Sequence, residues 1–166
     1  LSASTTLTAS RVTVMSNSRI IKSGPGTLES NATSIGAGGV LEIAAGLFQA
    51  NSGGAGFGQR GTGNTGTIQI NSPATLRVAG GSALMDTQVV NFAATGALFD
   101  LNGTDETIGT LSGPGTVEGG GTLRVLDGLT VNPGQTMQVN SPVVLRANAG
   151  GLGTVQLGGS IPLTLE

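Results

Sequence analysis

The chain has 166 residues and a formal net charge of −2, and only 10% of its residues are charged. This length suits a single domain, and the weak charge offers no electrostatic basis for binding nucleic acid or an anionic membrane surface. The sequence contains no cysteine and no histidine, which excludes disulfide bonds, catalysis by these residues and metal sites built from them. No apolar run approaches the about 20 residues that a membrane helix requires, so we expect no membrane insertion by this chain.

Short strands separated by turns are expected along the whole chain. Gly-Pro-Gly at 24–26 and 113–115, Asn-Gly at 102–103 and Asn-Pro-Gly at 132–134 are typical of turns. Almost no helix is expected, because only 44–50 and 82–86 offer any helical pattern. The predicted strands are residues 11–15, 19–22, 40–43, 67–70, 75–78, 88–92, 97–101, 107–111, 116–118, 122–125, 129–131, 136–139, 142–146, 154–157 and 161–165.

Four charged residues recur, each between two apolar residues: Arg77, Asp100, Arg124 and Arg146, at steps of 23, 24 and 22 residues. Alternate side chains of a strand point to opposite faces, so the apolar neighbours point inward and the charges outward. One short strand that recurs at such a period indicates a solenoid. Glu42 joins this charge ladder one coil earlier if about 12 residues of the Gly-rich segment 52–64 form a loop insertion.

Two further repeats agree with this period. Two similar segments, beginning at Gly66 and Gln135, lie 69 residues apart, which equals three steps of 23. The chain is therefore predicted to be all-β, a single β-solenoid (parallel β-helix) domain over residues 1–166, with about seven coils of about 22–25 residues. An apolar series recurs at steps of 22, 25, 22 and 22 residues: Ile70, Phe92, Val117, Val139 and Ile161.

Two stretches carry a family resemblance. The first reads IKSGPGTL at 21–28, followed by NATS at 31–34 and IGAGGVLEI at 35–43. The second reads FDLNGTDETIGTLSGPGTV at 99–117. Together they cover about a third of the chain and resemble the autotransporter-associated β-strand repeat, the second more closely than the first.

The resemblance implies a single-stranded, right-handed parallel β-helix in an exported bacterial surface protein. It therefore implies an extracellular or bacterial cell-surface location, and it carries no catalytic residues. The chain departs from the repeat at residues 31–33, where Asn-Ala-Thr replaces a segment that commonly holds an aromatic residue.

The candidate chemistry in the sequence favours structural interpretations. The segment 56–61 matches G-x-G-x-x-G, but no predicted helix follows it, so a structural loop is favoured over a phosphate site. Asp100, Asp105 and Glu106 could supply the acid and base of a glycosidase, although a solvated turn after Asn102 is favoured. The absence of Trp and Tyr weakens the sugar-cleft alternative further. We therefore expect no enzyme activity, no cofactor and no metal.

The predicted charge ladder has two interpretations. Charges stacked one strand spacing apart would pair across coils and contribute at most about 1 kcal/mol for each exposed pair. Alternatively, the ladder could be a docking face for a neighbouring subunit. The pairing interpretation is favoured.

The leading functional hypothesis is an extracellular structural subunit that self-associates end to end into a fibre or surface assembly. A short solenoid leaves an unpaired strand at each end, and such edges are templates for another chain. Neither terminus shows a capping helix or a strongly charged cap. The partner would be further copies of this chain. The predicted stacking residues are Leu1, Leu7, Ile161, Leu163 and Leu165.

Two alternatives from other classes remain. The chain could be a fragment of a bacterial autotransporter or adhesin passenger that mediates surface adhesion. Flanking coils would then cover its ends, and a host or matrix glycan or protein would be its partner. A carbohydrate-active β-helix enzyme is disfavoured because the predicted ladders place only isolated acidic residues on one face.

Overall fold

The computed structural model describes residues 5–51, 65–146, 149–150, 154–158 and 162–165. All regular structure in these ranges is β-strand, which confirms the all-β prediction. Residues 47–51 are a strand and 82–86 form turns and bends, so neither candidate helix is present. The predicted loop insertion at 52–64 falls outside the described residues.

The strands are β1 (Thr6–Ala9), β2 (Val12–Val14), β3 (Arg19–Lys22), β4 (Thr27–Ser30), β5 (Thr33–Ile35), β6 (Val40–Ile43), β7 (Leu47–Asn51), β8 (Thr67–Ile70), β9 (Thr75–Ala79), β10 (Val89–Phe92), β11 (Leu98–Asp100), β12 (Glu106–Ser112), β13 (Thr116–Glu118), β14 (Leu123–Thr130), β15 (Thr136–Val139), β16 (Val143–Leu145), β17 (Ala149–Gly150), β18 (Thr154–Leu157) and β19 (Leu163–Leu165).

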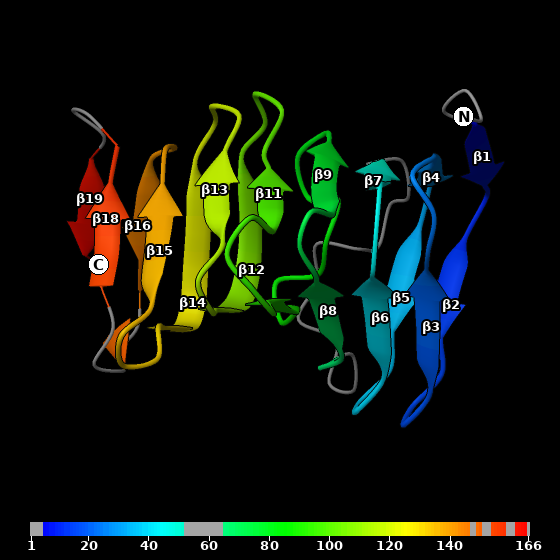
Figure 1. Cartoon of the computed structure of the whole chain (residues 1–166), viewed down its shortest axis with the longest axis horizontal. Coiled ribbons are helices and arrows are strands. Elements are labelled where there is room, and N and C mark those ends of the chain that lie inside the picture. Colours follow the sequence, from blue (N-terminus) through cyan, green and yellow to red (C-terminus); the bar gives the residue numbers. More distant parts are fainter. Residues whose placement is uncertain (1–4, 52–64, 147–148, 151–153, 159–161, 166) are drawn as a thin grey trace.

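The strands form two large parallel sheets. The eight-stranded sheet has the order β1-β4-β7-β9-β11-β13-β15-β18, and the nine-stranded sheet runs β19-β16-β14-β12-β10-β8-β6-β3, with β17 beside β14. The chain alternates between these sheets and advances by one strand at each return, so it is a β-solenoid of about seven turns. The two termini lie at opposite ends of the rod (Figure 1). The predicted solenoid is confirmed.

The hydrophobic core lies between the two large sheets. In the eight-stranded sheet, Phe48, Leu76 and Phe99 are successive inward neighbours, and all three are fully buried. In the nine-stranded sheet, Ile70 and Phe92 are such neighbours and are also buried. Each buried side chain of this size contributes about 1.5–3 kcal/mol, so these inward ladders hold the coils together.

A tight corner closes against one of these core residues. A Cβ on Gly115 would lie 2.2 Å from the ring of Phe92, a distance that no real side chain tolerates. Glycine is therefore required where the chain turns from β12 into β13. The turn prediction at 113–115 is thus explained by close packing as well as by backbone conformation.

The lengths of the coils vary more than the sequence repeats indicated. Paired strands bring together residues as close in sequence as Phe99 and Val117, and as distant as Phe48 and Leu76. The predicted apolar series is consequently divided, since Ile70 pairs with Phe92 in the nine-stranded sheet, and Val117 with Val139 in the eight-stranded sheet. The predicted partner Ile161 lies outside the described residues.

The two repeated segments are also divided between the sheets. The segment that begins at Gly66 contains β8 of the nine-stranded sheet, and the segment that begins at Gln135 contains β15 of the eight-stranded sheet. Both sheets demand the same apolar–polar alternation. Similar sequences can therefore occupy different faces of one solenoid.

The strand pattern changes along the rod. In the first two turns, β2 and β5 form a separate two-stranded sheet, and a turn at 36–39 separates β5 from β6. Farther along, β12 and β14 are seven and eight residues long and run through this region with an irregularity between Ile108 and Thr110. The solenoid therefore changes from three short strands per turn to one short and one long strand.

Candidate functional site at the two ends of the solenoid

Exposed large hydrophobic side chains gather at the two ends of the rod. In the described ranges they belong to the first turn and to β19: Leu7, Met15, Ile20, Ile21, Leu163 and Leu165. Four of these residues continue core ladders, because they pair with residues of the next coil that are buried or half-buried. Leu7 is 67% exposed and Leu165 is 74% exposed, so each end displays a cross-section of the core.

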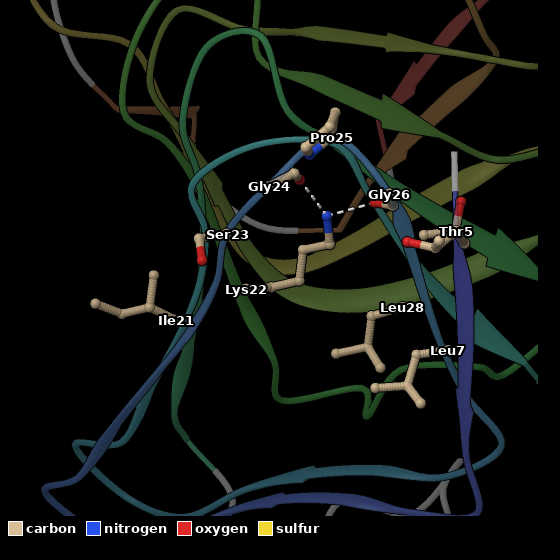
Figure 2. A pocket seen from close by; sticks show the side chains of 10 residues that line it. Thr5, Leu7, Ile21, Lys22, Ser23, Gly24, Pro25, Gly26 and Leu28 are labelled. Atoms are coloured by element: carbon tan, nitrogen blue, oxygen red, sulfur yellow. Dashed lines mark hydrogen bonds between the residues drawn. The ribbon is translucent and has the colours of Figure 1, made fainter. Parts of the chain in front are cut away.

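The N-terminal end contains a concave surface with a volume of about 380 Å³. Figure 2 shows the side chains of Leu7 and Leu28 side by side on its wall, while Ile21 lies across from them. The corner at 23–26 closes the top of this concavity. Leu7 stacks on Leu28 in the strand register, so the apolar wall is the open end of a core ladder.

Lys22 fills an inward position beside this concavity. It pairs with Ile43, which pairs in turn with Ile70, so the Lys22 side chain occupies the end of a core ladder and is only 7% exposed. Its Nζ donates hydrogen bonds to the carbonyl oxygens of Gly24 and Ala45, each at 2.7 Å, and also to that of Gly26 (Figure 2). Burial lowers the pKa of Lys22 below the usual value for lysine.

The N-terminal end is therefore partly closed by a buried cation, and the expectation that neither end has a charged cap is wrong there. Sequence reasoning placed Lys22 in the strand 19–22 without giving it a role. The signal was a lysine at an apolar ladder position directly before Gly24-Pro25-Gly26, whose tight corner turns carbonyl groups toward it.

The C-terminal end has a different character. A cavity of about 170 Å³ lies between the last coils, and its lining is entirely apolar. Leu145, Val155 and Leu163 contribute to it from β16, β18 and β19. No polar side chain lines this cavity, so the C-terminal end lacks a counterpart of Lys22.

Three of the five predicted stacking residues lie at these ends. Leu7 lies at the N-terminal end, and Leu163 and Leu165 lie at the C-terminal end. Leu1 and Ile161 fall outside the described residues. That these side chains stack against another copy remains a prediction.

The predicted charge ladder is not one continuous stripe. Arg77 and Asp100 are neighbours in the eight-stranded sheet, where Arg77 Nε lies 2.7 Å from Asp100 Oδ2. Arg124 lies in the nine-stranded sheet opposite Thr107. Arg146 follows β16 of that same sheet and donates its backbone N–H to the Val125 carbonyl at 3.0 Å. The four apolar–charged–apolar frames therefore belong to two sheets, and one of the predicted pairs forms.

Glu42 also lies in the nine-stranded sheet, apart from Arg77. Its carboxylate pairs with Arg19 and accepts a hydrogen bond of 2.6 Å from Asn71 Nδ2. The hydrogen bond from Arg19 is the main cause that holds the pKa of Glu42 below its usual range. Glu42 therefore stabilises the outer face of the first coils.

The three candidate catalytic carboxylates have separate structural roles. Asp100 pairs with Arg77, and Asp105 Oδ1 accepts a hydrogen bond of 2.7 Å from the backbone N–H of Thr122. Glu106 is 2% exposed, so the prediction of a solvated turn is wrong for this residue. Within the described ranges, no group of three acidic residues is arranged to hold a metal ion.

Glu106 fastens the segment between β9 and β10. Its Oε2 accepts backbone N–H groups of Ala83 at 2.7 Å and Leu84 at 3.3 Å, and its Oε1 accepts that of Thr107 at 3.0 Å. Leu84 is buried in the core. Burial raises the pKa of Glu106 to about 7, although these hydrogen bonds favour the charged form. Glu106 thus acts as a buried clamp.

Comparisons with known proteins identify no relative. No family model, no curated protein and no solved structure matches the chain. The part of the chain that the structure describes contains no helix of the length and apolarity needed to cross a membrane. The functional argument therefore depends on the geometry of the solenoid.

Proposed function

We propose that the protein is a non-catalytic, extracellular structural subunit that self-associates end to end into a fibre or surface assembly. The observation that carries this proposal is the exposure of core ladders at both ends. Leu7 at one end and Leu163 and Leu165 at the other occupy positions that are covered in the coils between them. Burying these side chains in a junction would be favourable, because each large apolar residue removed from water contributes about 1.5–3 kcal/mol.

The open strand edges support the same proposal. The eight-stranded sheet ends in β1 on one side and β18 on the other, and the nine-stranded sheet ends in β3 and β19. A second copy placed head to tail would present β1 to β18 in the parallel sense in which every described strand pair runs. Contacts between different ends of a molecule do not close on themselves and give filaments.

The non-catalytic and extracellular parts of the proposal have separate support. Asp100, Asp105 and Glu106 each have a structural partner, which leaves no obvious acid–base pair among them. The resemblance of residues 21–43 and 99–117 to an autotransporter-associated repeat supports an exported surface protein.

The same observation favours a second candidate, a segment of an adhesin passenger. If further coils precede β1 or follow β19 in a longer chain, they would cover Leu7, Leu163 and Leu165 without any second copy. The protein would then display its outer faces for adhesion to a host or matrix glycan or protein. The behaviour of the isolated 166-residue chain separates the two candidates.

Negative-stain electron microscopy of the purified chain over a range of concentrations tests the proposal. We expect unbranched filaments that lengthen with concentration. Leu7→Asp and Leu165→Asp each place a charge in the junction and should leave only monomers, whereas Thr136→Asp, on the exposed outer side of β15, should leave the filaments intact. A monodisperse monomer at every concentration would overturn the proposal and favour the passenger segment.

A further inference from the structure

A polar cleft lies on the flank of the solenoid, between its two ends. Its volume is about 390 Å³, within the range of small-molecule sites. Asn91 of β10, Ser112 of β12 and Thr130 of β14 form one side. Asn132 and Gln135 contribute from the turn that follows β14. The cleft therefore combines three successive coils with one projecting turn.

The three strand residues form an outward-facing ladder. Asn91 is paired with Ser112, and Ser112 is paired with Thr130, in the register of the nine-stranded sheet. Their side chains consequently repeat at the strand spacing of about 4.8 Å. The turn is held by a backbone hydrogen bond of 3.1 Å from Gln135 N–H to the Asn132 carbonyl, which keeps its two amides beside the ladder.

Several polar groups of this cleft are available to a ligand. Ser112 Oγ donates to Asn91 Oδ1 at 2.9 Å, which leaves the Asn91 NH₂ group free to donate elsewhere. Gln135 Oε1 is buried and has no hydrogen-bond partner in the structure. A buried acceptor without a partner is unfavourable, so a donor from a bound molecule would satisfy it.

Farther along the same ladder, the polar groups are already occupied. Gln69 donates to Asn71 at 3.0 Å, and Asn71 donates to Glu42 at 2.6 Å. Glu42 and Gln69 precede Asn91 in this ladder. The N-terminal part of the stripe is thus a closed hydrogen-bond network, whereas the part at the cleft keeps free donors and acceptors.

We propose that the cleft formed by Asn91, Ser112, Thr130, Asn132 and Gln135 binds an uncharged saccharide. Amide and hydroxyl groups pair with sugar hydroxyls, which both donate and accept hydrogen bonds. No ionisable side chain lines the cleft, so it has no cation for an acidic sugar and no carboxylate for hydrolysis. The cleft lies away from the stacking ends, so this inference is independent of the proposed function.

Saturation-transfer NMR observed on the saccharide tests this proposal, because the method works with monomers and filaments alike. Cellotetraose and maltotetraose are neutral probes, and tetragalacturonate is the acidic probe, each mixed with the full chain. We expect transfer to at least one neutral probe and little to the acidic one. The double variant Asn132→Ala/Gln135→Ala should weaken binding about tenfold, as the loss of two hydrogen bonds predicts.

Two controls keep the test specific. Gln138→Ala removes a similar amide from the outer face of β15 in the other sheet and should leave transfer unchanged. Thr130→Val keeps the shape of the strand residue and should weaken binding less than the double variant does. No transfer to either neutral probe, equal transfer to the acidic probe, or full binding by a folded double variant would overturn the proposal and leave a cleft filled only by water.

Discussion

The two ends of the solenoid terminate similar core ladders in different ways. At the N-terminal end, Lys22 takes the last inward position and its ammonium group binds carbonyl oxygens at the corner. At the C-terminal end, an apolar cavity of about 170 Å³ remains between the last coils. The first end contains a charged group with hydrogen-bond partners, whereas the second keeps unfilled apolar space.

This difference shows that exposed ladders at both ends need not be equally sticky or equally stable. A cavity deprives its lining of contacts, so the C-terminal coil should be the weaker part of the rod. The cation at the other end places a polar barrier beside Leu7. In an end-to-end contact, the C-terminal end would therefore supply most of the apolar surface that is still to be filled.

The largest expected effect concerns Glu106, a buried charge in the middle of the rod that serves as a reference for Lys22. Its pKa of about 7 lies above the usual 4.5, so the folded state holds a proton that the unfolded state has lost between these values. Stability should be full below about pH 4.5 and fall as the pH rises through 7, by up to about 3 kcal/mol.

Urea unfolding at a series of pH values measures this change. Glu106→Gln keeps an oxygen acceptor for Ala83 and has no titrating proton, so its stability should vary less between pH 4.5 and 7. Asp105→Asn, on the exposed neighbouring residue, is the matched control and should keep the slope of the original chain. An identical slope in the Glu106→Gln variant would show that another group is responsible.

The next effect concerns Lys22 at the N-terminal end. Lys22→Met keeps much of the side-chain volume but leaves the carbonyl groups of Gly24 and Ala45 without their donor, which should cost about 1–3 kcal/mol. The midpoint and slope of urea unfolding measure the loss. Arg146→Met removes an exposed cation as a control and should change stability little. An unchanged or higher stability of Lys22→Met would mean that the cation is not an effective cap.

The smallest effect compares one added methylene at the two ends. Val143→Ile adds a group beside the C-terminal cavity and should stabilise the fold by up to about 0.8 kcal/mol. Val14→Ile adds the same group to a buried site of the first turn and should destabilise it by about 1–3 kcal/mol through overpacking. Thermal unfolding of both variants measures the contrast. Equal effects would show that the two ends are packed alike.

The fold could be predicted from local patterns although part of the predicted register was wrong. Leu76-Arg77-Val78 and Leu123-Arg124-Val125 have the same frame, yet the first lies in β9 and the second in β14, in different sheets. The pairing of Arg77 with Asp100 was predicted correctly because both coils between the residues have ordinary length. The pairing with Arg124 failed because β13 intervenes in the eight-stranded sheet.

The candidate sites were predictable to different degrees. Leu7, Leu163 and Leu165 could be located at the ends, because position along the chain is position along the rod in a solenoid. Lys22 and Glu106 could not be recognised, because their partners are backbone groups brought close by corners and by the segment 80–88. The cleft at Ser112 also escaped prediction, since it depends on which outward residues share a ladder.

The sequence by itself determined that the chain forms short strands in successive coils with open apolar ends. That information is local, because apolar–polar alternation sets which side chains point inward and glycine-rich turns set where each strand stops. Only the tertiary structure decided which strands share a sheet, how Lys22 and Glu106 are buried, and where free polar groups meet. The physical reason is that alternation has a period of two residues and carries no record of the partner, while the coil length varies from Phe99–Val117 to Phe48–Leu76.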